Sequence, residues 1–241
     1  MRAIILVAGR GSRLPKKLSN NPKSFLKINN KMIIEKLINN FNENGISNIA
    51  LVTGYKKSKF NRFYLKKFHN KKWKETNMVY SLYQADKWLT KYKCIVSYGD
   101  IFYEKKAVKN LILDKNLISV SYDPYWKKLW KMRFKNPLDD AETFKINKKK
   151  NIIELGKKTK SYSNIQGQYM GLMKFEPRGW KIFKKCLEKN FNNNFQKLYL
   201  TDVLQKLIEE KILIRGVKFD GKWAEVDSKI DYSVMKKIFK A

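Results

Sequence analysis

The chain has few of the residues that most often carry catalytic or structural chemistry, with two cysteines and one histidine in 241 residues. Cys94 and Cys186 lie far apart and have no cysteine or histidine neighbour at metal-binding spacing, so we expect two ordinary buried thiols. The histidine, His69, lies in the basic stretch 66–72, where we expect a surface position. Neither residue type is therefore expected to carry the chemistry.

Long hydrophobic runs are also missing. No run of about 18 apolar residues occurs, and the chain begins with one arginine before a short strand-like segment. We therefore expect no membrane span and no signal peptide, and a cytoplasmic protein. A length of 241 residues with 43% hydrophobic content is enough for one sizeable core, so we expect a single domain, 1–241.

Acidic residues are scarce, 21 against 53 basic ones, which gives a net charge of +32. Such a charge first suggests nucleic-acid binding. However, only 7 of the basic residues are arginine and 46 are lysine, and these are scattered through the chain with 22 asparagines. Specific readers of nucleic acid favour arginine for its bidentate geometry. We therefore expect salt-sensitive, non-specific adhesion and no specific nucleic-acid partner.

The most informative feature present is a glycine-and-arginine loop after the first strand. Residues 2–8 form an apolar strand, 9–13 read Gly-Arg-Gly-Ser-Arg, and Pro22-Lys23 follows ten residues later. Two glycines let backbone N–H groups approach an anion, while Arg13 and Lys23 supply charge for a polyphosphate. The spacing matches neither the P-loop nor the dinucleotide fingerprint. The alternative is a tight turn with solvated basic residues.

Short apolar runs alternate with helical patterns along the first 100 residues, which predicts an α/β fold with a mixed, mostly parallel sheet in a three-layer αβα, Rossmann-like arrangement. We expect strands at 2–8, 49–52 and 94–98 and helices at 32–44, 57–68 and 79–89. Ligands should collect at the carboxyl ends of the strands.

Two aspartates follow strand-like stretches and are candidates for a metal site. Asp100 comes directly after the strand 94–98, and Asp227 follows Trp223-Ala224-Glu225-Val226 before a helical segment. Two carboxylates suit Mg²⁺, which uses few protein ligands beside phosphate oxygens and water. Taken alone, either aspartate is also a typical turn or N-cap residue.

Between these aspartates, residues 123–165 lose the regular alternation. We expect a cap-like insertion of short, mostly antiparallel strands, including 142–146 and 151–155, separated by a turn at Lys148–Lys150. The next stretch, 164–172, has glycines flanking polar and aromatic residues. It suits either a strand whose backbone touches a ligand or an ordinary bulged strand.

Collectively, these motifs resemble the nucleotidyltransferase superfamily, and within it the phosphocholine cytidylyltransferase-like branch. Its members join CTP to small phosphorylated or phosphonylated alcohols and amines, including phosphocholine, 2-aminoethylphosphonate and phosphoglutamine. The resemblance covers nearly the whole chain. It is carried by the opening loop and by 76–82, 98–100, 153–158, 166–172, 200–205 and 223–228.

The resemblance implies roles for individual residues. The nucleotide would be cradled by Ala8, Gly9, Gly11 and Ser12, with Asn77 and Ser81 near the base and ribose and with Arg13 and Lys23 as the catalytic cations. Mg²⁺ would be held by Asp100 and Asp227. The acceptor would meet Lys157 or Lys158, Gln168, Tyr169, Asp202 and Trp223.

The expected activity is the Mg²⁺-dependent transfer of CMP from CTP to the phosphate or phosphonate of a small acceptor, with release of pyrophosphate, for cell-surface glycan decoration. The basic surface favours a phosphorylated or phosphonylated amino compound over choline. Two alternatives remain open, a sugar-1-phosphate nucleotidyltransferase using UTP or dTTP and a basic nucleic-acid-binding protein. The sequence leaves the oligomeric state, monomer or homodimer, open.

Overall fold

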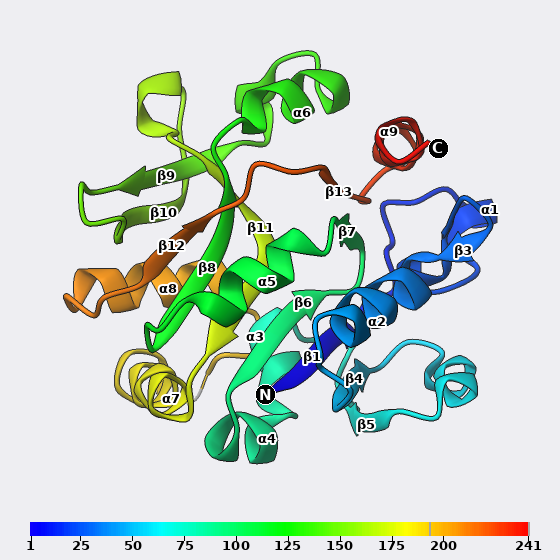
Figure 1. Ribbon diagram of the computed structural model, residues 1–241, viewed down its shortest axis with the longest axis horizontal. Coiled ribbons are helices and arrows are strands. Elements are labelled where there is room, and N and C mark those ends of the chain that lie inside the picture. Colours follow the sequence, from blue (N-terminus) through cyan, green and yellow to red (C-terminus); the bar gives the residue numbers. More distant parts are fainter. Residues whose placement is uncertain (193, 241) are drawn as a thin grey trace.

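A computed structural model describes residues 1–192 and 194–240, and its centre is a seven-stranded sheet (Figure 1). The strand order is β12-β8-β11-β6-β1-β4-β5. In chain order these strands are β1 (Arg2–Val7), β4 (Ile49–Thr53), β5 (Lys66–His69), β6 (Cys94–Tyr98), β8 (Ile118–Asp123), β11 (Gln168–Phe175) and β12 (Arg215–Lys218).

The sheet is mixed and mostly parallel. β1 pairs in parallel with β4 and β6, β4 with β5, and β8 with β12. β11 alone among these strands runs antiparallel to both of its neighbours, β6 and β8. The expected fold class is confirmed, and the carboxyl ends of β1, β4 and β6 meet at one edge of the sheet.

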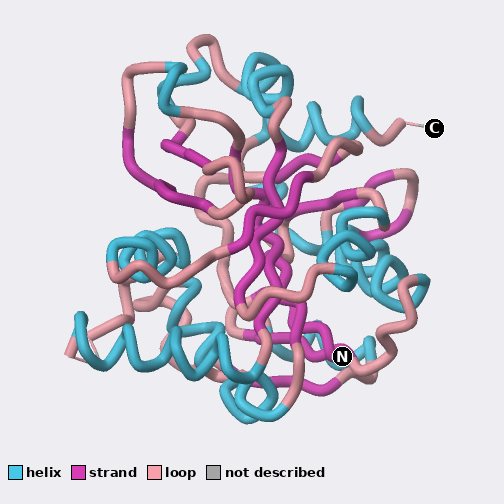
Figure 2. The backbone as a smooth tube through the Cα atoms, turned by 60° about the vertical axis from the view of Figure 1, so that its left-hand side comes forward, coloured by secondary structure: helices cyan, strands magenta, loops and turns pink. Residues whose placement is uncertain are grey.

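Helices cover both faces of the sheet, because the central strands are apolar on both sides. In β1, Ala3, Ile5 and Val7 belong to the core on one face, and Ile4 and Leu6 belong to the core on the other. Figure 2 shows the strands as a band through the molecule with helices on either side. The first face carries α2 (Ile33–Glu43) and α5 (Lys106–Leu113), and the second carries α3 (Met78–Tyr83), α4 (Asp86–Lys91), α7 (Pro177–Phe191) and α8 (Leu200–Glu209).

Helix α2 shows how local sequence sets one of these elements. Ile34, Leu37 and Phe41 repeat at helical spacing and are fully buried. The backbone N–H of Met32 donates to the Glu35 carboxylate at 2.7 Å, which satisfies one free donor at the first turn. The helix ends before Gly45, which has a φ of +76° that favours glycine. The prediction of a helix over 32–44 is confirmed.

Two predicted helices are wrong in part. Instead of one helix over 57–68, the chain forms a 3₁₀ helix, Lys57–Phe63, and then β5, because Tyr64 adopts a left-handed conformation with φ of 50° and ends the helix. Residues 66–69 then pair with the free edge of β4. The predicted helix over 79–89 is two helices, α3 and α4, separated at residues 84 and 85.

The segment 123–165 contains the expected antiparallel pair and an unexpected helix. β9 (Glu142–Ile146) pairs with β10 (Ile152–Lys158), while α6 (Trp126–Arg133) occupies a stretch where we expected only strands. Trp126, Leu129 and Trp130 bury one side of α6 against the core. Short 3₁₀ helices at Pro137–Asp139 and Tyr162–Asn164 complete the segment.

The remaining elements extend the first face. β13 (Trp223–Glu225) pairs antiparallel with β7 (Ile101–Tyr103), and α9 (Lys229–Ile238) follows it. Near the first loop lie α1 (Lys16–Ser19), a 3₁₀ helix (Lys23–Phe25) and the pair β2 (Lys27–Ile28) and β3 (Lys31–Met32). Cys94 and Cys186 are buried free thiols, as expected. Within the described part of the chain, no helix has the length and apolar character needed to cross a membrane.

Candidate active site

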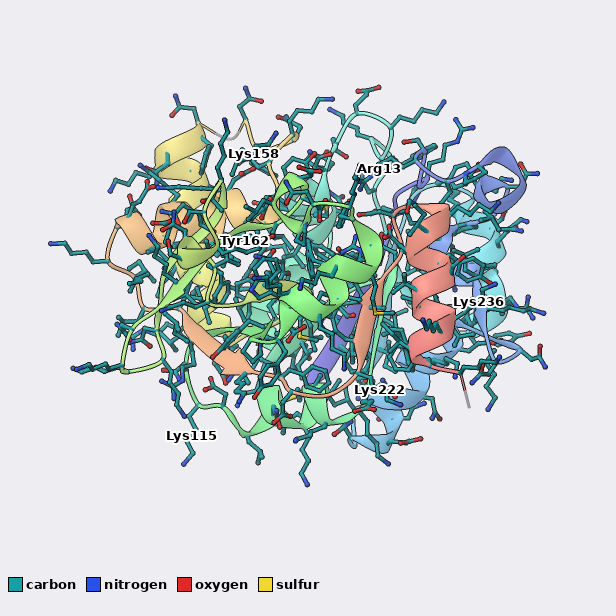
Figure 3. The ribbon with its side chains drawn as sticks, turned by 90° about the horizontal axis from the view of Figure 1, so that it is seen from above. Arg13, Lys115, Lys158, Tyr162, Lys222 and Lys236 are labelled. Carbon is teal, nitrogen blue, oxygen red and sulfur yellow. The ribbon has the colours of Figure 1, made fainter. Side chains whose placement is uncertain are left out.

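A cleft opens at the carboxyl ends of β1 and β6. It consists of a cavity of about 320 Å³ and an adjoining one of about 190 Å³, and Leu6, Gly9, Asn77, Tyr98 and Asp100 line both. Arg13, at this edge, and Lys158, at the end of β10, lie on the same side of the molecule, whereas Lys115 lies at the opposite edge (Figure 3). This is the position where open α/β sheets bind ligands.

The opening loop lies close to Lys23. Gly11 has a φ of +71°, and a Cβ atom there would lie 2.6 Å from the Lys23 Cγ atom. A larger residue would therefore both strain the loop and displace the lysine. Glycine at this position lets Lys23 lie against the loop and reach the floor of the cleft.

Lys23 joins residues from opposite ends of the chain. Its Nζ atom lies 2.9 Å from Asp100 Oδ2 and 2.5 Å from Asp227 Oδ1, and an Arg13 guanidinium nitrogen lies 2.8 Å from the same Asp227 oxygen. Burial alone would lower the pKa of Lys23, but the two carboxylates outweigh it and raise that pKa above its usual value. Burial would likewise raise the pKa of Asp227, but Lys23 and then Arg13 hold it below its usual range.

Asp100 reaches the cleft because β6 ends against β1. The backbone N–H of Gly99 donates to the Leu6 carbonyl at 2.9 Å. A Cβ atom at Gly99 would lie 2.4 Å from Val7 Cγ1, so only glycine allows this close approach. Asp100, the next residue, therefore emerges beside the opening loop.

A buried ion network fixes the turn that carries Asp227. Asp231 Oδ2 accepts the backbone N–H groups of Asp227 at 3.0 Å and Ser228 at 2.8 Å. Arg133 of α6, whose side chain is 1% exposed, donates to Asp231 Oδ1 at 2.8 Å and to Glu225 Oε1 at 2.5 Å. Sequence reasoning missed Arg133, because no motif links α6 to a strand about 90 residues later.

The adjoining cavity is the smaller part of the cleft. Asn77 begins α3 and its side chain donates to the Lys197 carbonyl at 2.5 Å, while Ser81 Oγ accepts from Asn70 Nδ2 at 3.0 Å. Ala8 and Trp73 also line this end. Trp73 was not expected, although an aromatic residue in a loop facing a cleft is a typical partner for a nucleobase.

The residues expected around the acceptor do not line a single cavity. Lys157 and Asp202 line a separate depression of about 270 Å³ between β10 and α8, and the Asp202 carboxylate accepts the backbone N–H of Tyr199. Trp223 is 3% exposed and donates to Asp123 Oδ2. Lys158 is exposed at the end of β10. Gln168 and Tyr169 begin β11, which pairs with β6, and line neither cavity of the cleft.

Gln168 and Tyr169 differ in what their side chains do. The Gln168 amide hydrogen-bonds to the backbone of Glu142, accepting from its N–H at 3.3 Å and donating to its carbonyl at 2.5 Å. The Tyr169 hydroxyl is buried and interacts with the side chain of Tyr98. Both side chains are therefore engaged by the protein itself.

The donors at the cleft suit a hard divalent cation held by few protein ligands. Within residues 1–192 and 194–240, no group of three or more histidine, cysteine, aspartate or glutamate side chains is placed to hold a metal. Asp100 and Asp227 instead converge on one positively charged group, the Lys23 ammonium. Two carboxylates beside a site for phosphates fit Mg²⁺, which retains waters and phosphate oxygens as ligands.

Comparison with known proteins places this site in a family. Residues 3–116 match the family described as MobA-like NTP transferase domain. The CTP:phosphoglutamine cytidylyltransferase of Campylobacter jejuni is 38% identical, and the match covers 97% of this chain and 98% of that protein. The bifunctional protein GlmU of Methanocaldococcus jannaschii is 30% identical over 94% of this chain, which spans 51% of that protein.

A solved structure extends the likeness to the fold. The CTP:phosphocholine cytidylyltransferase of Streptococcus pneumoniae superposes with a TM-score of 0.75 at 22% identity, covering 99% of each chain. Fold and sequence together define a nucleotidyltransferase. The chain belongs to the nucleotidyltransferase superfamily, in its phosphocholine cytidylyltransferase-like branch, as its motifs suggested.

Proposed function

We propose that the protein is a Mg²⁺-dependent cytidylyltransferase that transfers CMP from CTP to the phosphate or phosphonate of a small acceptor. Phosphoglutamine is the first candidate, because the relative matched over its full length is named for it. The products are pyrophosphate and a CDP-linked or CMP-linked compound, which we assign to cell-surface glycan decoration. The observation that carries the proposal is the convergence of the opening loop, Lys23, Asp100 and Asp227 on one cleft.

The reaction needs no general base. A phosphate oxygen of the acceptor is already an anion near neutral pH, and it attacks the α-phosphorus of CTP while the bond to the pyrophosphate oxygen breaks. Two anions must approach each other, so Lys23 and Arg13 reduce their repulsion and hold the reacting atoms in line. Mg²⁺ on Asp100 and Asp227 would supply further positive charge to the triphosphate.

The two parts of the cleft suit the two parts of a nucleotide. The basic, glycine-rich part between Gly9 and Lys23 suits the triphosphate, with the backbone of residues 8–12 as donors. The smaller part, lined by Trp73, Asn77 and Ser81, suits the base and ribose.

The test is pyrophosphate release measured across CTP, UTP, dTTP, ATP and GTP. Each nucleotide is combined with phosphoglutamine, phosphocholine, 2-aminoethylphosphonate and a sugar 1-phosphate. We expect turnover only with CTP and a phosphorylated or phosphonylated amino compound, and loss of turnover with EDTA. Turnover with UTP or dTTP and a sugar phosphate would instead support a sugar-1-phosphate nucleotidyltransferase.

A further inference from the structure

One tryptophan, Trp73, lines the smaller cavity of the cleft. Four of the six tryptophans in the chain are at most 4% exposed. Trp73 is partly exposed, and it lines the cavity of about 190 Å³ together with Ala8, Asn77 and Ser81. An indole ring in such a position offers an apolar, aromatic surface that a ligand can cover.

The Trp73 indole differs from the buried indoles in its contacts. The N–H groups of the four buried tryptophans all donate to protein oxygens, whereas the Trp73 N–H donates to none of residues 1–192 and 194–240. The ring contacts the Tyr55 ring, with centroids 5.2 Å apart, and the exposed Lys74 ammonium, 5.7 Å from the centroid. The second distance is near the outer limit of a cation–π contact, so a ligand can displace the lysine.

A buried asparagine fixes the loop that carries Trp73. The fully buried side chain of Asn70 donates to Thr76 Oγ1 at 2.9 Å and to Ser81 Oγ at 3.0 Å. Its amide oxygen accepts the backbone N–H of Lys72 at 2.9 Å. A satisfied buried network of this kind holds one conformation, so the loop is ordered before a ligand binds.

The same loop packs on the carboxyl ends of β4 and β1. A Cβ atom at Gly54 would lie 2.5 Å from Trp73 Cβ and 2.7 Å from the Ala8 carbonyl oxygen, so glycine allows this close approach. The backbone N–H of Tyr55 donates to the Ala8 carbonyl at 2.9 Å, and the Arg10 guanidinium lies 5.8 Å from the centroid of the Tyr55 ring. Trp73 is therefore held beside the opening loop.

The distribution of charge along the cleft favours an uncharged aromatic group against Trp73. Arg13, Lys23 and Asp227 line the main cavity and not the smaller one, so phosphates belong in the main cavity. Tyr199 is another exposed aromatic residue at the cleft, but it lines the main cavity. Stacking on Tyr199 would place a base among the charged groups, whereas stacking on Trp73 places it beside them.

We propose that Trp73 is the platform on which the nucleobase stacks, held in place by Asn70, and that it supplies affinity for the base without choosing among pyrimidines. This assignment rests on the proposed function. Every base has an aromatic face, so stacking tolerates a change of base. Discrimination between CTP and UTP then comes from hydrogen bonds to the edge of the base.

The test measures binding and does not depend on turnover. Calorimetry and the quenching of tryptophan fluorescence give the Kd values of CTP, UTP, CMP and inorganic tripolyphosphate. We expect Trp73→Leu to raise the Kd of CTP, UTP and CMP by the same factor, about 10- to 100-fold, the size for losing one stacked base. The Kd of tripolyphosphate should not change, and Trp73→Phe, which keeps an aromatic ring, should lose less affinity than Trp73→Leu.

Three further variants separate this role from a structural one. Trp88→Phe, at a partly exposed ring beside Arg2 and Phe68 and outside both cavities, should keep the quenching and every Kd. Tyr199→Leu should leave the Kd of CMP unchanged. Asn70→Ala should raise the Kd of CMP but not that of tripolyphosphate, and it should cost little more when Trp73→Leu is already present, because the two residues act together.

Each outcome decides the assignment. An unchanged Kd for CMP in Trp73→Leu, an equal loss for tripolyphosphate, or a loss in Tyr199→Leu in its place would overturn it and leave the cytidylyltransferase proposal intact. A much larger loss for CTP than for UTP would make Trp73 a selector of the base and overturn its role as a neutral platform. If the unmodified protein binds neither CTP nor UTP, the proposed function fails and this assignment fails with it.

Discussion

Lys23 is the residue on which the electrostatics of the cleft depend, because its ammonium group contacts the carboxylates of both Asp100 and Asp227. Under the proposed function, the same ammonium would bind the phosphates of the nucleotide. An enzyme that joins two anions needs such a preorganised positive charge in the transition state.

We predict that Lys23→Ala and Asp100→Ala each lower turnover by about 10² or more, the size seen when one charge-stabilising group is lost. Pyrophosphate release at saturating CTP measures the effect. Lys27→Ala, at an exposed lysine four residues later, is the control and should retain normal turnover. Near-normal kinetics in either cleft variant would remove that residue from the mechanism.

Gly11 allows a residue-scale test of how the loop and Lys23 fit together. Gly11→Ala introduces a Cβ atom 2.6 Å from Lys23 and strains a φ of +71°, so we predict at least a tenfold fall in turnover. The matched control is Gly45→Ala, where φ is +76° but no atom lies within 4 Å of the new Cβ. Both variants should lose about 1–2 kcal/mol of stability in urea denaturation. Equal turnover in the two would show that the contact with Lys23 is unimportant.

At the scale of elements, helix α6 is joined to the Asp227 turn. Arg133 on α6 pairs with Glu225 and Asp231, and Asp231 in turn holds the backbone of Asp227 and caps α9. One helix of the segment 123–165 therefore fixes the turn that carries Asp227, a residue lining the cleft.

We predict that Arg133→Met destabilises the protein by about 3–5 kcal/mol, because it leaves buried carboxylates without their cation. The Mg²⁺ concentration needed for half-maximal turnover should also rise, since the Asp227 turn loses its support. Urea denaturation and a Mg²⁺ titration of pyrophosphate release measure the two effects. Arg178→Met, at an exposed arginine of α7, should change neither. An unchanged Mg²⁺ requirement in a folded Arg133→Met would exclude the positioning role.

Element boundaries also show what the sequence could and could not predict. Local pattern was enough to predict the strands 2–7 and 94–98 and the helix α2. Each has a regular apolar pattern that is bounded by a glycine or a charged residue. Residues 66–69 were assigned to a helix because their own pattern is weak, and their strand exists only through pairing with β4. Tertiary pairing there outweighs local propensity.

The candidate site likewise contains residues that local sequence pattern predicts and residues that only tertiary contacts identify. Arg13, Lys23, Asp100 and Asp227 were predictable, because each follows a strand or lies in a recognisable loop. Arg133 lies in the irregular segment and acts through Glu225 and Asp231, which are more than 90 positions away. Asp202 and Trp223, which we expected at the acceptor, have other contacts. Asp202 caps α8, and the buried Trp223 indole donates to Asp123. Only the structure shows these contacts.

At the scale of the whole molecule, a strongly basic protein has a local concentration of acids at its cleft. A net charge of +32 attracts anionic nucleotide and acceptor from a distance. We predict that kcat/KM for CTP falls several-fold between about 50 and 500 mM salt while kcat changes little, because salt screens this attraction. Steady-state kinetics at several ionic strengths measure it. A salt-independent kcat/KM would show that the surface charge has no part in substrate capture.

Glu142 on β9 affects global stability in a pH-dependent way, because burial, and then the charges of Asp140, Asp202 and Glu225, raise its pKa. Its pKa is raised from its ordinary value to about 7, so the folded state binds the proton more tightly than the unfolded state, and stability falls as pH rises through this window. We predict that Glu142→Gln increases the free energy of unfolding by about 1–2 kcal/mol at pH 8 and has little effect at pH 4. Urea denaturation at the two pH values decides this. A destabilised Glu142→Gln at pH 8 would mean that the carboxylate has a stabilising partner.

The most direct measurement of the central claim is Mn²⁺ binding, followed by electron paramagnetic resonance, in the presence of a non-hydrolysable CTP analogue. If both ends of the chain hold the metal–triphosphate complex, the unmodified protein binds Mn²⁺ tightly only with the nucleotide, and Asp227→Asn weakens that binding at least tenfold. Unchanged Mn²⁺ affinity in Asp227→Asn, with nucleotide still bound, would contradict the account.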